Sequence, residues 1–209
     1  MIGHAPPIRL LATGLAALAG FVDATGFIHL DGYFVSFMSG NSTRLAVGLA
    51  SWSDEAALAG GLIASFVAGV VLGSLVGGWA GGHSRAAVLG LVAGLLAIAA
   101  GCGAAGASTL AAVAMALAMG AENAVFERVS EVRIGLTYMT GTLVRVGQRL
   151  AAALRGGPTF GWLPDLVFWA GLVGGAVAGA AAYPMFGLGN LWLAAGVSAM
   201  LGVAAWRRG

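Results

Sequence analysis

The sequence predicts an all-α polytopic membrane protein, a bundle of membrane helices forming a single integral membrane domain over residues 1–209. Two observations predict this fold class. Hydrophobic residues make up 59% of the 209 residues and charged residues only 9%, too few to cover the surface of a soluble protein. The apolar residues also come in long runs, without the alternation that membrane β-strands require. The lipid bilayer is therefore the expected surrounding of the chain.

Eight apolar segments follow one another along the chain, and each is close to the length of a membrane-spanning helix. A helix needs about 20 residues to cross roughly 30 Å of hydrocarbon. The breaks between segments are short and hold most of the charges, so no separate soluble domain is expected. The segments cover approximately residues 8–30, 33–51, 56–81, 86–103, 108–126, 134–154, 163–185 and 189–206.

The two halves of the chain resemble each other. Phe37-Met38-Ser39-Gly40 matches Tyr138-Met139-Thr140-Gly141, and Arg44 matches Arg145, at a spacing of about 100 residues. Similar matches occur upstream and downstream of these motifs at nearly the same spacing. We therefore predict two copies of one unit, as in many membrane transporters. The copies extend over about residues 8–105 and 108–206.

Polar residues interrupt the second and sixth apolar segments near their centres. Glycine permits local unwinding there, while hydroxyl, amide and guanidinium groups could meet an ion or a small polar or anionic solute. Small polar residues also pack helices without any ligand, but the repetition of the pattern favours a binding role. The candidate binding residues are Ser39, Gly40, Asn41, Thr43 and Arg44 in the second segment and Thr140, Gly141 and Arg145 in the sixth.

The arginines distinguish two topologies. An arginine at the bilayer centre costs at least about 2.5 kcal/mol, so the second and sixth segments are expected to be broken or re-entrant, leaving about six full crossings. Most arginines then fall on one side, both termini are cytoplasmic in a bacterial inner membrane, and the repeats are inverted. In the alternative, eight segments cross, the repeats are parallel, and Arg85, Arg128 and Arg133 lie on the other side.

Acidic residues inside apolar runs form a second group of candidate site residues. Asp23 lies in the first segment, and Glu122 with Asn123 occupies the matching region of the second half. Buried acids are costly and need partners, for which Arg44 and Arg145 are available. Asp23 or Glu122 could carry a proton or cation, or could instead form a structural clamp with an arginine.

Several classes of function lack support in the sequence. There is no P-loop, nucleophile elbow, HExxH motif or dinucleotide fingerprint, so we expect neither an enzyme nor a bound cofactor. The histidines lack the spacing of metal ligands. A net charge of +2, distributed along the chain, gives no reason to expect nucleic-acid binding.

The polar motifs resemble those of the YoaK-type family of bacterial multi-pass membrane proteins, a domain of unknown function. The resemblance covers essentially the whole chain and rests on four segments. Glu122 stands where the family usually has glutamine, which puts a neutral-amide role at that position in doubt. The resemblance implies a multi-pass inner-membrane protein and supplies no substrate. The matching segments are Gly20-Phe21-Val22-Asp23-Ala24, Phe34 to Arg44, Glu122-Asn123-Ala124 and Thr137-Tyr138-Met139-Thr140-Gly141.

Two functional hypotheses follow. The first is a small-solute or ion transporter or channel, with its polar site where the two interruptions meet near the midplane. The second is a membrane-embedded interaction or assembly protein without transport activity, which would use glycine-rich faces for helix association or for a homo-oligomer. Glycines at four-residue spacing let helix backbones approach closely. They occur at Gly69 and Gly73 and at Gly171, Gly175 and Gly179.

Overall fold

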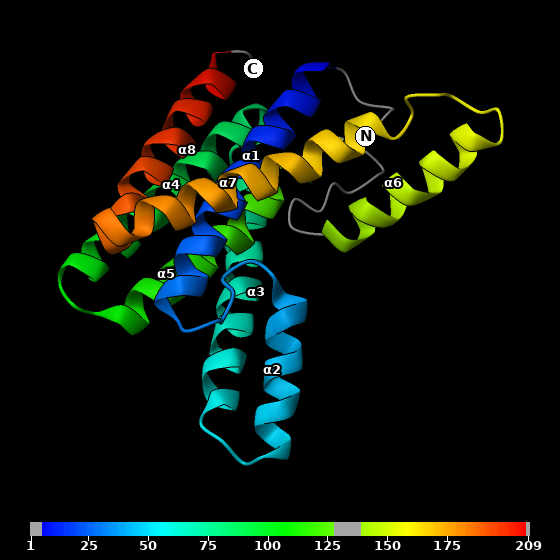
Figure 1. The fold of residues 1–209 in the computed structure, drawn as a ribbon. Coiled ribbons are helices and arrows are strands. Elements are labelled where there is room, and N and C mark those ends of the chain that lie inside the picture. The colour runs from blue at the N-terminus through cyan, green and yellow to red at the C-terminus, as the bar shows by residue number, and fades with distance from the viewer. Residues whose placement is uncertain (1–5, 128–138, 208–209) are drawn as a thin grey trace.

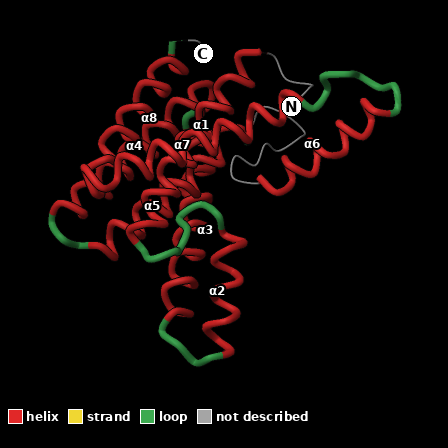
Figure 2. The backbone as a smooth tube through the Cα atoms, in the orientation of Figure 1, coloured by secondary structure: helices red, strands yellow, loops and turns green. Residues whose placement is uncertain are grey.

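The computed structural model describes residues 6–127 and 139–207, and all regular elements in these ranges are helical (Figures 1 and 2). The prediction of an all-helical fold is therefore confirmed for this part of the chain. Arg128, Arg133, Tyr138 and Arg208 lie outside the described residues. The α-helices are α1 (Pro6–His29), α2 (Met38–Ala50), α3 (Glu55–Trp79), α4 (Ser84–Ala104), α5 (Ser108–Glu122), α6 (Met139–Leu154), α7 (Leu163–Phe186) and α8 (Leu191–Trp206), with short 3₁₀ turns η1 (Gly81–His83), η2 (Asn123–Phe126) and η3 (Gly187–Asn190).

Five helical stretches in the described ranges are long and apolar enough to cross a membrane. The last of them contains both α7 and α8, which are joined through η3 at Gly187, a residue with φ of 52°. The helices α2 and α6 fall outside these stretches, because both are short and carry the polar residues of the predicted interruptions. The stretches are Arg9–His29, Glu55–Trp79, Gly81–Ala104, Ser108–Phe126 and Leu163–Trp206.

The second apolar segment is not broken at its centre. α2 runs without interruption from Met38 to Ala50, and the irregular part of the segment is residues 30–37, which precede it. Hydroxyl groups inside α2 bond to their own helix: Ser42 Oγ donates to the Met38 carbonyl at 2.8 Å, and Thr43 Oγ1 donates to the Ser39 carbonyl at 3.2 Å. Because the polar side chains are satisfied in this way, they do not interrupt the helix.

Helices α1 and α7 pack with their backbones in direct contact. A Cβ atom added at Gly175 would lie 1.9 Å from the carbonyl oxygen of Ala17, and one at Gly179 would lie 2.3 Å from that of Phe21. Only glycine fits such an approach. Residue numbers rise together along the two helices, so α1 and α7 run parallel.

Helices α3 and α5 form a second pair of the same kind. A Cβ atom at Gly69 would lie 2.1 Å from the Leu117 carbonyl oxygen, and one at Gly120 would lie 2.0 Å from that of Phe66. Gly73 faces Ala121 one turn further along. These contacts also advance together in both helices, so α3 and α5 are parallel. The predicted close approach at glycines of both halves is confirmed.

The third major pair, α4 and α8, runs in opposite directions. Ser198 Oγ donates a hydrogen bond to the Leu89 carbonyl at 2.9 Å, and Gly202 lies near Ala86. At the other end of α4, Gly103 faces the Leu188 side chain. Residue numbers therefore fall along α4 as they rise along α8, which makes the pair antiparallel.

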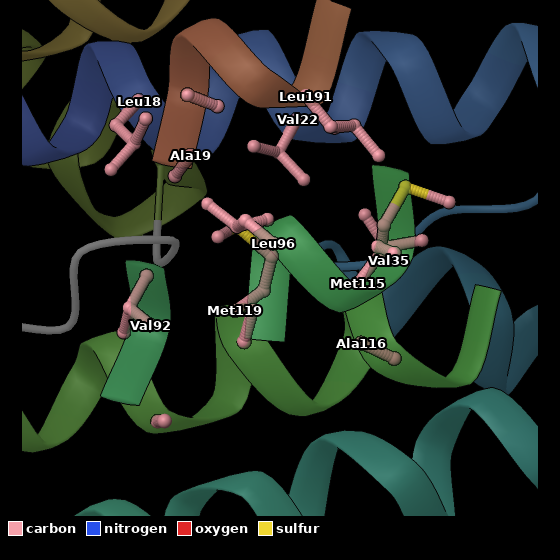
Figure 3. Packing of buried hydrophobic residues seen from close by; sticks show 14 of the residues in the cluster. Leu18, Ala19, Val22, Val35, Val92, Leu96, Met115, Ala116, Met119 and Leu191 are labelled. Carbon is pink, nitrogen blue, oxygen red and sulfur yellow. The ribbon is translucent and has the colours of Figure 1, made fainter. Parts of the chain in front are cut away.

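The apolar core lies where α1, α4, α5 and α8 meet (Figure 3). Val22 of α1, Leu96 of α4, and Met115 and Met119 of α5 are fully buried there, together with Leu191 of α8. The centre of the bundle is thus filled by hydrocarbon and thioether side chains.

Helices α2 and α6 lie away from this core. α2 packs against α3, with which it projects from the body of the bundle as a hairpin, whereas α6 packs against the beginning of α7 on another side (Figure 1). The two helices that carry the predicted binding motifs therefore rest on different parts of the bundle.

Substitution of glycine will test the α1–α7 contact. We expect Gly175→Ala to lower the free energy of unfolding of the detergent-purified protein by about 1–3 kcal/mol, because the alanine Cβ would overlap the Ala17 carbonyl. The loss is measured as a lower melting temperature. Gly174→Ala is the matched control, since nothing lies within 4 Å of a Cβ at that position. Equal melting temperatures for the two variants would contradict the packing.

Candidate functional site

Asp23 in α1 holds the irregular residues that precede α2. Its Oδ1 accepts hydrogen bonds from the backbone N–H groups of Val35 and Ser36, both at 2.8 Å. Val35 and Ser36 are buried, and buried backbone N–H groups outside a helix need such an acceptor. Asp23 is therefore a clamp on residues 30–37, and its partners are backbone amides instead of the arginine that the sequence suggested.

Asn41, at the beginning of α2, clamps the same segment from the other side. Its Oδ1 accepts from the Phe34 N–H at 3.0 Å, and its Nδ2 donates to the Phe34 carbonyl at 2.6 Å. The side chain is fully buried. The amide thus satisfies both backbone groups of one residue, as a neighbouring strand would.

Gly40 and Arg44 complete this local packing. A Cβ atom at Gly40 would lie 2.8 Å from the rings of Phe34 and Phe37, so the glycine makes room for two aromatic side chains. The Arg44 guanidinium carbon lies 4.4 Å from the centre of the Tyr33 ring, within range of a cation–π interaction. Both residues help to order the α1–α2 connection.

Ser39 and Thr43 are exposed on the surface of α2. The Thr43 hydroxyl bonds only within the helix, to the Ser39 carbonyl. The exposed side of α2 therefore presents a serine and a threonine, while its buried side holds the clamp.

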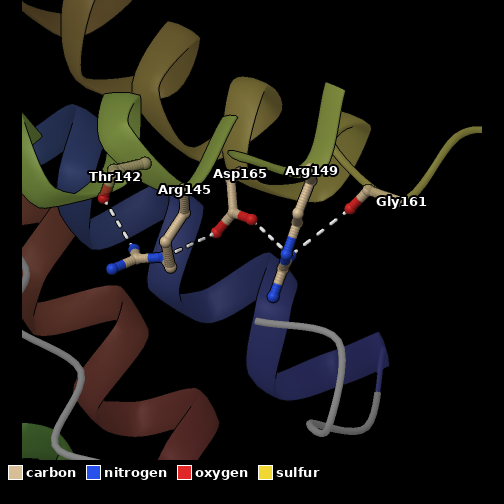
Figure 4. A network of polar contacts seen from close by, with 5 residues as sticks. All are labelled: Thr142, Arg145, Arg149, Gly161 and Asp165. Carbon is tan, nitrogen blue, oxygen red and sulfur yellow. Dashed lines mark hydrogen bonds and ion pairs between the residues drawn. The ribbon is translucent and has the colours of Figure 1, made fainter. Parts of the chain in front are cut away.

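The arginine of the second half belongs to an ion-pair cluster (Figure 4). Asp165, in the first turn of α7, is fully buried between two guanidinium groups. Arg145 Nε donates to Asp165 Oδ1 at 3.2 Å and Nη2 donates to Thr142 Oγ1 at 2.9 Å. Arg149 Nη1 donates to Asp165 Oδ2 and to the Gly161 carbonyl. These contacts attach α6 to α7.

Asp165 and Arg149 were not among the residues singled out from the sequence. A usable signal was present, because Arg145 and Arg149 are four residues apart and so share one face of a helix. An acid directly after Pro164, at the start of the next helix, was the available partner. Thr140, by contrast, is exposed and Gly141 is half-buried in the first turn of α6.

Glu122 differs from every other acid in the described residues. Its side chain is fully buried at the end of α5, and neither carboxylate oxygen has a hydrogen-bond partner. The next residue, Asn123, donates from Nδ2 to the Met119 carbonyl at 2.9 Å. Glu122 is thus a buried ionisable group that the fold leaves without a partner.

The candidate residues do not form one cluster. Asp23, Gly40, Asn41 and Arg44 gather around residues 30–37, and Arg145 joins Asp165. Within the described ranges, residues 6–127 and 139–207, no hydrogen bond or ion pair links α2 with α6. The expected meeting of the two polar motifs is therefore absent from the described part of the chain, because each motif is tied to its own neighbouring helix.

Two substitutions at Asp23 separate a clamp from an ion carrier. We expect Asp23→Asn to keep a near-native melting temperature, because an amide oxygen can still accept both N–H groups. Asp23→Leu leaves two amides unpaired, at about 1–3 kcal/mol each, and should be strongly destabilised in a thermal melt. Asp54→Leu is the control, since Asp54 is exposed and its side chain makes no cap bond. Equal damage from Asn and Leu would mean that the charge itself is required.

Comparisons with known proteins agree with the motifs. The family described as "Protein of unknown function (DUF1275)" matches residues 11–204. The chain is 38% identical over 197 residues to "UPF0700 transmembrane protein RA0705" of Rhizobium meliloti (strain 1021), an alignment that covers 94% of this chain and 85% of that protein. No solved structure matches. The chain therefore belongs to the DUF1275 family, the YoaK/UPF0700 group of multi-pass transmembrane proteins.

Proposed function

We propose that the protein is a transporter or channel of the bacterial inner membrane that carries a proton or a small monovalent cation past Glu122. The observation that carries the proposal is the state of this side chain, which is fully buried with both carboxylate oxygens unpartnered. It lies within a stretch, Ser108–Phe126, that is long and apolar enough to cross the bilayer. The proposal assigns the chain no catalytic chemistry.

The energetic argument rests on the cost of an isolated charge. Moving an unpaired carboxylate into a protein interior costs several kcal/mol even after relaxation. Ionisable residues inside membrane helices usually mark ion pathways or proton relays. The two arginines of α6, Arg145 and Arg149, already form ion pairs with Asp165. Because neither carboxylate oxygen of Glu122 accepts a hydrogen bond, the proposal assigns a proton or a bound cation as its partner.

Helix directions support a topology of six crossings. If all eight helices crossed, alternate helices would run in opposite directions, and α4 and α8 would be parallel. If α2 and α6 do not cross, then α1 and α7 are parallel, α3 and α5 are parallel, and α4 and α8 are antiparallel. The glycine contacts and the Ser198 hydrogen bond give these three relations. With six crossings both termini lie on one side of the membrane, and the distribution of arginines favours the cytoplasmic side.

The same contacts support an inverted repeat. With α1–α4 matched to α5–α8, the α1–α7 pair corresponds to the α5–α3 pair, and α4–α8 corresponds to itself. Gly20 and Gly120 hold equivalent places, each touching the third helix of the other half. Inverted repeats with sites at the repeat interface are a recurring transporter design.

The alternative of an assembly protein receives less support. It relied on glycine-rich faces that would bind another protein. The glycines at positions 69, 73, 171, 175 and 179 instead contact helices of the same chain. What remains exposed on α3 is a row of apolar side chains such as Val67 and Val71, which lipid can cover.

Cysteine accessibility will test the six-crossing topology. We expect Gly82→Cys, in the α3–α4 turn, to be cytoplasmic and protected from a membrane-impermeant thiol reagent added to intact cells. Ala105→Cys, in the α4–α5 turn, should react, because α4 crosses once between them. Both are made in a Cys102→Ala background, which removes the single native cysteine. Labelling of Gly82→Cys with protection of Ala105→Cys would overturn the proposed orientation, and labelling of both would exclude a crossing by α4.

Flux through proteoliposomes will test the role of Glu122. We expect the wild-type protein to pass H⁺, Na⁺ or K⁺ above the level of empty liposomes, measured with separate imposed gradients and an internal pH or potential dye. Glu122→Gln keeps the shape of the side chain and removes its charge, and should lower that flux at least about tenfold, the loss typical of a residue that handles protons directly.

The matched control for this experiment is Glu127→Gln. Glu127 is an exposed acid five residues further along the chain, and its substitution should leave the flux unchanged. Absence of flux for all three ions in the wild type, or equal flux in the wild type and Glu122→Gln, would contradict the proposal.

A further inference from the structure

A second group of buried polar side chains lies between the ends of α1 and α7 and the turn η3. Thr25 Oγ1 donates to the Phe21 carbonyl at 2.9 Å, so it accepts the bond from Asn190 Nδ2, also at 2.9 Å. This bond fixes the orientation of the Asn190 amide, whose Nδ2 also lies 3.5 Å from the Gly179 carbonyl. Asn190 is 1% exposed, and its Oδ1 has no partner.

One helical turn beyond Thr25, His29 adds another unpartnered atom. Its Nδ1 lies 2.9 Å from the Tyr183 hydroxyl of α7, while its buried Nε2 has no partner. In the tautomer whose Nδ1–H donates to Tyr183, Nε2 presents a lone pair. Residues four apart share one face of a helix. In that tautomer two acceptors lack donors, and they belong to Asn190, which contacts α1 at Thr25, and to His29, one turn further along α1.

The surroundings favour positive charge. Because α1 and α7 are parallel, their C-terminal ends come together here, and each end carries a partial charge of about −0.5. Pro184 has no N–H, so the Ala180 carbonyl lacks its usual partner inside α7. Asp31, exposed two residues beyond His29, makes none of the ion pairs described for residues 6–127 and 139–207.

We infer that Thr25, His29, Tyr183 and Asn190 form a binding site for a small monovalent cation. Asn190 Oδ1 is the direct ligand, Thr25 orients its amide, and His29 and the helix ends supply further electron-rich groups. Converging helix C-termini and freed carbonyls hold cations in many transporters. The site goes beyond the proposed function, because it is built on α1, α7 and η3 instead of α5, and its occupancy does not require transport.

Thermal stability of the purified full-length chain in detergent will test the site. Melting temperatures are compared in NaCl, KCl, LiCl and NH₄Cl against choline chloride at equal ionic strength. We expect at least one of the small cations to raise the melting temperature by about 3 °C or more relative to choline. An ordered water in place of a cation predicts equal melting temperatures in all salts, and that result would overturn the inference.

Variants assign the effect to the cluster. Asn190→Leu and the gentler Thr25→Val should each abolish or clearly reduce the difference between the stabilising cation and choline, measured within each variant. Ser198→Ala is the control, because Ser198 is a buried hydroxyl in α8 that bonds to Leu89 and not to the cluster. A cation effect that survives both Asn190→Leu and Thr25→Val would place the cation elsewhere and overturn the assignment.

A spectroscopic measurement covers the case in which Asn190→Leu does not fold. The chain has three histidines, so ¹⁵N-histidine labelling with His4→Gln and His83→Gln leaves His29 alone. Its ring nitrogen shifts should change with the stabilising cation and not with choline, and unchanged shifts would contradict the site. Glu122→Gln should retain the cation effect, so loss of ion flux and loss of cation binding report separately on the proposed function and on this site.

Discussion

Direct contact between helix backbones at glycine is the constraint on which this bundle depends. Lipid offers helices little hydrophobic reason to associate, so close van der Waals packing must hold them together. The contacts of Gly175 and Gly179 with α1, and of Gly69 and Gly120 between α3 and α5, fix two parallel pairs. These pairs set the positions of the apolar core, of the antiparallel α4–α8 pair, and of the helix ends where polar groups accumulate.

Three acids inside or beside apolar helices meet the cost of burial in different ways. Asp23 accepts backbone N–H groups, and Asp165 is held between two guanidinium groups. Glu122 has neither kind of partner. The first two solutions order a loop and attach a helix, which are structural tasks. The third leaves an energetic cost that the fold itself does not offset, and this contrast separates Glu122 from the other acids as the centre of the proposed transport activity.

The sequence predicts the helical class, the approximate segment limits, the family and the glycine contacts, because each depends on local pattern or composition. It does not predict the partners of the charged side chains. The sequence allows Asp23 to pair either with an arginine or with backbone amides. The path of residues 30–37 determines that its partners are the amides of Val35 and Ser36. In the same way, the ion pair of Arg145 with Asp165 depends on how the connection between α6 and α7 folds, which the sequence pattern does not show. Periodicity also cannot show that Ser42 and Thr43 bond within α2 and leave the helix intact.

The pairing of α1 with α7 has a consequence for biogenesis. Helix α1 is synthesised well before its glycine-lined partner α7, which follows it after five intervening α-helices of the described chain. The same delay separates Thr25 and His29 from Asn190 and Tyr183. During synthesis α1 therefore enters the bilayer before these polar partners exist, and the α1–α7 contact can form only after α7 has been made. A chain truncated before α7 lacks the surface against which its first helix packs.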